Sequence, residues 1–212
     1  MARHFYLVRH TDSVPGAQMD SARPLTDDGK AKAEKLAKWL RALIGRVDIV
    51  IASPFVRTMQ TAAPFGKELG AIVASTNGLE PEGRTANYAW EEINRLAQQS
   101  KEILLVGHGP ALSTLCLWLM GYDGDNEELR FDYGSIARLK LTDPNDREAG
   151  KGDGKLQWLA EPDLILPAVD LVEAAESLMH LEASVPDLER VVRMRLVSEL
   201  EDGGVLCQIT EP

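Results

Sequence analysis

Two arginines and two histidines could do phosphate chemistry together, judged by their types and positions. Arg9 and His10 come directly after the first apolar run of the chain, and His108 comes after another apolar run, between two glycines. Arg57 follows a third apolar run by a few residues. Guanidinium groups offer fork-shaped contacts to phosphate oxygens, and a neutral imidazole can act as a nucleophile. These residue types predict a site that binds a phosphoryl group and transfers it.

The apolar runs must be neighbouring strands if these side chains are to meet. Strand-like runs alternate with helix-like segments along the first four-fifths of the chain: strands at 4–8, 47–52, 71–74 and 102–106, helices at 26–43, 54–70, 87–99 and 110–121. This alternation predicts an α/β fold with three layers, α/β/α, around a mostly parallel sheet. In such sheets ligands bind beyond the carboxyl ends of the strands, where helix N-termini favour anions.

Turn and cap residues support several of these boundaries. Thr26 is expected to cap the helix at 26–43, and Gly45 to end it. Ser53 is expected to cap the next helix, with Pro54 in its first position. Two later runs, 135–141 and 155–160, predict an antiparallel hairpin at the edge of the sheet.

The end of the chain differs in composition from the rest. We expect a catalytic domain over 1–161 and an acidic, helical extension over 162–212, with helices at 168–183 and 187–200. From Val169 onward there are ten acidic residues against three arginines. The extension is expected to pack on the domain, to mediate self-association or to dock a partner. His4, within a strand, and His180, in the acidic extension, are expected to be structural.

Composition and charge exclude several classes of protein. The net charge is −10, which argues against nucleic acid as a partner. No apolar run is long enough to cross a membrane, and charged residues interrupt the N-terminal apolar stretch, so neither membrane insertion nor secretion is expected. Cys116 and Cys207 lack the spacing of metal ligands and suit a reducing cytoplasm.

Four motifs resemble the signatures of the histidine phosphatase superfamily, which has the phosphoglycerate mutase-like fold. They are VRHTDS at 8–13, RPLTDDGKAKA at 23–33, SPFVRTMQTA at 53–62 and LLVGHGP at 104–110. Within that superfamily, the chain is most similar to the SixA type of protein phosphohistidine phosphatase. The supporting segments are the early RPLT, FDYGSIARLKL, and GKLQWLAEPDLI. One departure is Thr11, where the family has glycine after the histidine.

The resemblance implies a role for each residue of the predicted site. His10 would attack phosphorus and become transiently phosphorylated, while Arg9 and Arg57 would bind the non-bridging oxygens. His108 would stabilise the transferring group. At the position that departs from the family's glycine, Thr11 is small, and we expect its hydroxyl to reach the phosphate. No cofactor and no metal are expected. His10 must be neutral to attack, and neighbouring guanidinium groups disfavour its protonation. His108 can be cationic and act as a third donor.

The proton donor stays open between three carboxylates and none. In related phosphatases a carboxylate in the loop after the third strand is the general acid and base, which here indicates Glu80 or Glu82, and Asp12 lies beside the nucleophile. Phosphohistidine makes such an acid unnecessary, because its imidazole can leave as a neutral ring. A sugar alkoxide would need far more help. The loop at 75–86 is too short for a large cap, which favours a protein-borne substrate over an enclosed metabolite.

The sequence therefore predicts a cytoplasmic phosphatase that acts on protein phosphohistidine. The alternative within enzymes is a phosphatase of small phosphomonoesters, and a mutase is disfavoured because it needs a closed site. The alternative from another class is a non-catalytic phosphate-binding module that regulates a partner. The presence of His10, Arg57 and His108 together argues against that module.

Overall fold

The computed structural model describes residues 2–16, 18–81, 85–122, 129–141, 151–152, 154–163 and 165–166. The two helices predicted at 168–183 and 187–200 lie outside these ranges, as does Glu82. The division at residue 161 stays a prediction, although Ile165 is buried in the core just beyond it.

A six-stranded sheet forms the centre of the fold, with the strand order β3-β2-β4-β1-β5-β6. The strands are β1 (Arg3–Arg9), β2 (Ile49–Ala52), β3 (Ile72–Ser75), β4 (Glu102–Gly107), β5 (Ile136–Leu141) and β6 (Gly154–Ala160). The first four are parallel to one another, whereas β5 pairs antiparallel with both β1 and β6. The predicted parallel sheet and its antiparallel edge hairpin are confirmed.

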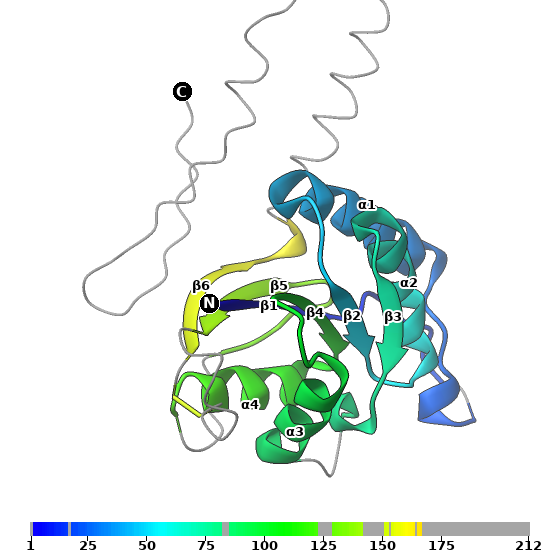
Figure 1. Ribbon diagram of the computed structural model, residues 1–212. Helices are drawn as coiled ribbons and strands as arrows, with labels where there is room; N and C mark the ends of the chain where they lie inside the picture. Colours follow the sequence, from blue (N-terminus) through cyan, green and yellow to red (C-terminus); the bar gives the residue numbers. More distant parts are fainter. Residues whose placement is uncertain are drawn as a thin grey trace, which may run out of the picture.

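Helices cover both faces of the sheet, so the three-layer prediction is also confirmed (Figure 1). α1 (Asp27–Ile44) and α2 (Val56–Leu69) lie on one face, and α3 (Ala86–Leu96) and α4 (Gly109–Leu119) on the other. Alternate residues of each parallel strand join opposite cores, because successive side chains of a strand point to opposite faces. On β1, Phe5 and Leu7 pack under α3 and α4, while Tyr6 and Val8 pack under α1 and α2.

Helix caps confirm some boundaries and correct one. Thr26 accepts a hydrogen bond from the Gly29 amide as N-cap of α1, and Gly45, with φ of +82°, ends the helix. The predicted start of α2 at Ser53-Pro54 is wrong, because the N-cap is Phe55, whose own backbone is extended. The Ser53 hydroxyl accepts from the Phe55 amide at 3.5 Å and lies 3.1 Å from a ring nitrogen of His108.

Two short 3-10 helices lie in loops that follow strands, η1 (Asp20–Ala22) after β1 and η2 (Asn77–Leu79) after β3. Within the part of the chain that the structure describes, no helix is long and apolar enough to span a membrane.

Candidate active site

Three neighbouring strands bring the predicted residues to one edge of the sheet. His10 follows β1, His108 follows β4 and caps α4, and Arg57 is the second residue of α2, which follows β2. β4 lies between β1 and β2, so the three strand ends are adjacent. All three side chains are buried, with 3 to 4% of their surface exposed. The juxtaposition expected from the strand ends is therefore present.

Arg57 connects the two histidines. Its Nε donates to His10 Nε2 at 3.2 Å, and its Nη2 lies 3.3 Å from His108 Nδ1. The two imidazole rings meet edge to face, with centroids 5.1 Å apart. The outer side of the guanidinium contacts Asp20, with Nη1 donating to the backbone carbonyl at 2.7 Å and Nη2 to the carboxylate at 2.9 Å.

The hydrogen bonds assign a tautomer to each histidine, because arginine can only donate. His10 Nε2 and His108 Nδ1 must therefore be acceptors. The other nitrogen of His10 lies 2.8 Å from the Thr11 carbonyl, which can only accept, so the ring carries its proton on Nδ1. His108 correspondingly donates from Nε2 to the Ser53 hydroxyl. The lone pair of His10 Nε2 thus faces the arginine that is predicted to hold a phosphate.

Both histidines are neutral at neutral pH in the ligand-free protein. Burial lowers the pKa of His10 to about 4, against the opposing effect of the Thr11 carbonyl, and the charges of Arg57 and Arg9 lower it further. The predicted effect of the arginines has the expected sign, but burial is the larger cause.

Burial also lowers the pKa of His108 to about 3, with His10 and Arg57 adding to the shift. His108 would be a cationic donor, as the sequence allows, only if a bound anion raised this pKa.

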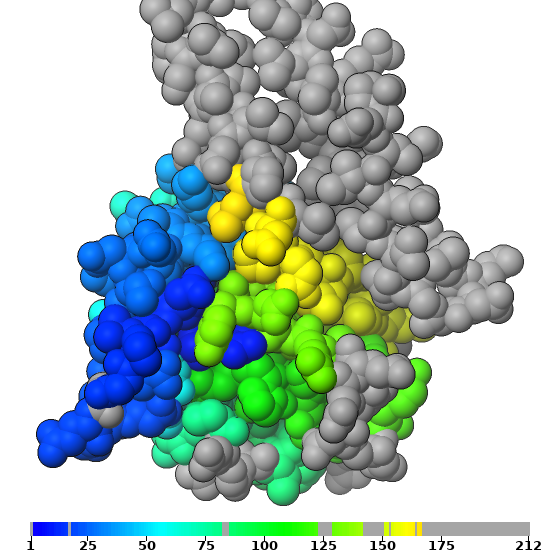
Figure 2. Space-filling model, turned by 180° about the vertical axis from the view of Figure 1, so that it is seen from behind, coloured from blue at the N-terminus to red at the C-terminus, as the bar shows by residue number. Residues whose placement is uncertain are grey.

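Arg9 is held by the turn that leads into β5. Its Nη1 donates to the Phe131 carbonyl, and its guanidinium carbon lies 3.8 Å from the ring centroid of Tyr133. A Cβ at Gly109 would lie 3.3 Å from the guanidinium, so a side chain there would require Arg9 to shift by a few tenths of an ångström. The Arg9 Nε is buried and has no hydrogen-bond partner among the described residues. A phosphate oxygen would satisfy this donor. The blue N-terminal segment and the light-green residues before β5 are in contact in Figure 2.

The position of Thr11 corrects its predicted role. The side chain is fully buried, and its hydroxyl donates to the Gly29 carbonyl at 2.8 Å. Its oxygen also lies 3.4 Å from the Thr61 hydroxyl. A side chain in place of Gly29 would collide with the Asp12 carbonyl at 2.2 Å, so this turn packs tightly on α1. Thr11 therefore fastens the turn after His10 to α1 and α2, and its hydroxyl proton is not available to a phosphate.

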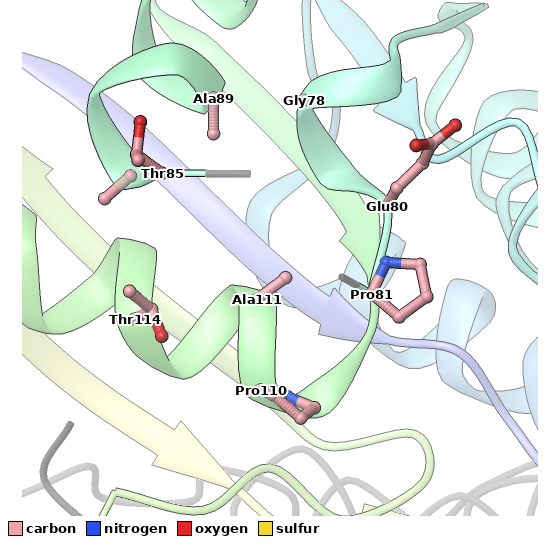
Figure 3. A pocket seen from close by; sticks show the side chains of 9 residues that line it. Gly78, Glu80, Pro81, Thr85, Ala89, Pro110, Ala111 and Thr114 are labelled. Atoms are coloured by element: carbon pink, nitrogen blue, oxygen red, sulfur yellow. The ribbon is translucent and has the colours of Figure 1, made fainter. Parts of the chain in front are cut away.

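Two of the three candidate acids, Asp12 and Glu80, lie within the described part of the chain. Glu80 lines a small pocket of about 90 Å³ between η2, α3 and α4, and its carboxylate points away from the α3 and α4 side chains there (Figure 3). None of Arg9, His10, Arg57 and His108 is among the described residues that line this pocket. Asp12 forms a 2.6 Å ion pair with Lys32.

Sequence patterns did not indicate a site role for four residues that contact the site. Asp20 binds Arg57, and Ser53 binds His108. The Phe55 ring lies 5.1 Å from that of His108, and the Tyr133 ring lies 5.3 Å from that of His10. Asp20 and Tyr133 come from loops without regular periodicity, so only their proximity to the motifs RPLT and FDYGSI could have singled them out. Among the described residues, no group of three or more His, Cys, Asp or Glu side chains is placed to hold a metal ion.

Comparisons with known proteins indicate the family of the chain. A model of the histidine phosphatase superfamily (branch 1) matches residues 5–81. The phosphohistidine phosphatase SixA of Escherichia coli is 36% identical over 164 residues, which cover 74% of this chain and 92% of that protein. An uncharacterized protein of Mycobacterium tuberculosis is 34% identical over 141 residues, 63% of this chain and 87% of that one.

Solved structures share the fold. The protein histidine phosphatase SixA complexed with tungstate superposes with a TM-score of 0.63 and 26% identity, over 76% of this chain and 97% of that one. A mycobacterial glucosyl-3-phosphoglycerate phosphatase shares the fold at a TM-score of 0.61 and 16% identity, over 74% of this chain and 97% of that one. The protein therefore belongs to the histidine phosphatase superfamily, as a phosphatase of the SixA type.

Proposed function

We propose that the protein removes phosphoryl groups from phosphohistidine on other proteins, through a phosphorylated intermediate on His10. The observation that carries this proposal is the state of His10: a buried, neutral ring whose Nε2 lone pair faces the guanidinium of Arg57. Phosphoryl transfer needs mainly positioning and stabilisation of charge. The buried Arg9 Nε and the start of α4 at His108-Gly109 supply further donors for a phosphate.

The first step needs no proton transfer between residues. His10 Nε2 attacks phosphorus, and the bond from phosphorus to the substrate imidazole breaks. If the other nitrogen of that imidazole is protonated, the electron pair returns to the leaving nitrogen and the ring departs neutral. His10 becomes a cationic phosphorylated ring, whose Nδ1–H stays on the Thr11 carbonyl. Charge and protons balance, because one imidazole replaces another.

The second step is hydrolysis of the phosphorylated His10. Water attacks phosphorus on the side opposite Nε2, the phosphorus–nitrogen bond breaks, and its electron pair returns to Nε2. Both protons of the water end on inorganic phosphate as the dihydrogen anion. Arg9, Arg57 and His108 would bind the equatorial oxygens in both steps.

The surroundings of one candidate acid support the choice of substrate. Asp12 is already engaged by Lys32 in a 2.6 Å ion pair. An alkoxide leaving group would need a proton from such a group, whereas a protonated imidazole does not. The printed name of the Escherichia coli relative, a phosphohistidine phosphatase, adds support. We also propose a cytoplasmic location, and self-association or partner docking by residues 162–212.

The decisive experiment compares substrates and variants. A phosphohistidine-bearing protein, p-nitrophenyl phosphate and a panel of sugar phosphates are offered to the wild type, His10→Ala and Glu80→Gln. We expect His10→Ala to be inactive on all of them, and Glu80→Gln to slow phosphomonoesters while sparing phosphohistidine. Turnover confined to sugar phosphates would replace the proposed substrate by a small phosphomonoester and keep the mechanism. Phosphate binding without any hydrolysis would support the non-catalytic module instead.

A further inference from the structure

Tyr133 is an exposed ring directly beside the proposed nucleophile. Its centroid lies 5.3 Å from that of His10, and the planes are tilted by 45°. The side chain is 40% exposed, whereas His10 is only 4% exposed. Tyr133 therefore lies on the solvent side of the site, while the imidazole that it contacts lies beneath the surface.

The turn around Tyr133 holds the ring in place. The Phe131 carbonyl accepts from Arg9 Nη1, and the amide of Gly134 donates to the Arg9 carbonyl at 3.2 Å. Gly134 has φ of +90°, a conformation that side chains rarely adopt, so the turn depends on glycine there. The Arg9 guanidinium packs on the Tyr133 ring at 3.8 Å. The ring is thus a fixed wall.

A leaving group must depart on the solvent side of the site. In an in-line displacement it lies opposite the attacking nitrogen. His10 and His108 close the inner side of the site, since both are buried. Two aromatic rings are more exposed than the histidines that they contact: the half-buried Phe55 meets His108 edge to face at 5.1 Å, and Tyr133 lies beside His10 at a tilt of 45°. A planar leaving group would therefore pass beside these rings.

We propose that Tyr133 is a specificity-determining residue whose ring stacks on the planar leaving group of the substrate. This inference rests on the proposed function, in which that group is the imidazole of phosphohistidine. Arg9 and Tyr133 then have different roles. The guanidinium binds the phosphate oxygens, and the tyrosine ring that packs on it selects the leaving group. A substrate whose leaving group has no ring would not stack on Tyr133, so its kcat/KM would not depend on the aromatic side chain.

The test compares two phosphorus–nitrogen substrates that differ in the ring. Wild type, Tyr133→Phe and Tyr133→Leu are assayed with a phosphohistidine peptide and with phosphoramidate, which has the same bond and no ring. Aromatic stacking favours binding by about three- to tenfold. We expect the ratio of kcat/KM for phosphohistidine to that for phosphoramidate to fall by about this factor in Tyr133→Leu and to be retained in Tyr133→Phe. Tyr122→Leu is the matched control, since Tyr122 is an exposed tyrosine outside the site.

A second measurement separates stacking from mere support of Arg9. Inhibition by orthovanadate reports the oxyanion site without any ring, and stacking predicts an inhibition constant within about twofold of the wild type in Tyr133→Leu. If the kcat/KM ratio is unchanged in Tyr133→Leu, the proposal is overturned. If kcat/KM falls equally for both substrates and vanadate inhibits more weakly, the role of Tyr133 is to hold Arg9. If the wild type does not hydrolyse phosphohistidine, the proposed function fails. The ratio of kcat/KM for p-nitrophenyl phosphate, which has a ring, to kcat/KM for acetyl phosphate, which has none, is then measured in the same variants. A fall of this ratio in Tyr133→Leu but not in Tyr133→Phe supports stacking, and an unchanged ratio overturns it.

Discussion

His4 and His10 lie at opposite ends of β1 and have opposite surroundings. His4 Nδ1 is 2.7 Å from the carboxylate of Glu102, which also accepts from the Tyr6 hydroxyl. His10 contacts no carboxylate among the described residues; its Nδ1 binds the Thr11 carbonyl and its Nε2 accepts from Arg57. Two histidines at opposite ends of one strand thus contact side chains of opposite charge: a carboxylate at the amino end and a guanidinium at the carboxyl end.

This contrast shows that neighbours, rather than residue type, determine what a histidine can do. At the amino end of β1, a carboxylate engages Nδ1 of His4. Burial and guanidinium groups favour the neutral ring and leave its lone pair available. Only the carboxyl edge, where strand ends and helix N-termini meet, gathers the cations that a phosphate needs.

Replacing each histidine by glutamine gives the largest expected difference. His10→Gln removes the nucleophile and should lower kcat by at least about a thousandfold. His4→Gln should leave kcat within about twofold, because His4 is remote from the carboxyl edge. Steady-state assays with p-nitrophenyl phosphate would measure both, and acid-labile labelling with radioactive substrate would detect the intermediate in the wild type. Comparable losses in the two variants would contradict the contrast.

Arg57→Lys keeps the charge and removes the fork that joins His10 to His108. We expect kcat/KM to fall by about a hundredfold, since a single ammonium group cannot replace the geometry of a guanidinium. Arg41→Lys, on the exposed end of α1, is the matched control and should have no effect on activity. Full activity in Arg57→Lys would show that charge alone suffices.

The buried neutral state of His10 predicts a loss of stability in acid. The unfolded chain binds a proton near pH 6.5, whereas the folded protein does so near pH 4, so the free energy of unfolding falls as the pH drops through this window. The contribution of His10 is about 3 kcal/mol, present above pH 6.5 and lost by about pH 4. Urea unfolding at pH 7 and pH 4.5 would measure the free energy of unfolding, which should decrease less between these pH values in His10→Gln than in the wild type. Identical decreases would mean that groups other than His10 cause the loss of stability in acid.

Asp20→Asn tests the carboxylate that occupies the outer side of Arg57. Partial burial opposes ionisation of Asp20, but hydrogen bonds from Arg57 and Arg23 hold its pKa below the usual range. Removing this charge should free Arg57 for an anion and lower the inhibition constant of orthovanadate by about two- to fivefold. Glu34→Gln, on the surface of α1, should leave inhibition unchanged. Weaker inhibition in Asp20→Asn would mean that the carboxylate aligns Arg57 and does not compete with the anion.

Sequence patterns predicted the sheet and the four central residues because both depend on local rules. Strand-forming runs and helix caps fix the order of elements, and parallel topology then forces the ends of β1, β2 and β4 to meet. The start of α2 was wrong because tertiary contact overrode the cap preference: the hydroxyl of Ser53 binds His108. The same limit hid the role of Thr11, whose hydroxyl binds Gly29, eighteen positions away in the sequence.

Loop residues were harder to predict, because nothing in their spacing shows where a loop folds back. Asp20 reaches Arg57 across 37 positions and Tyr133 reaches His10 from a turn more than a hundred residues later. Such contacts depend on the path of the whole chain and carry no periodic signal. Burial, the main cause of the low pKa of His10, is equally a property of the assembled fold.

The strand that bears His10 lies where the polarity of the sheet reverses, with parallel β4 on one side and antiparallel β5 on the other. On one side of the nucleophile lies the end of β4, and on the other lies the short turn that enters β5 and carries Tyr133. A turn can change length or sequence without shifting the register of the strands beside it. Exchange of the exposed residues Asp132 and Tyr133 would therefore retune the substrate range of this architecture, while Phe131 and Gly134 keep the contacts that hold Arg9. Directed evolution of a new phosphatase would begin at these two positions.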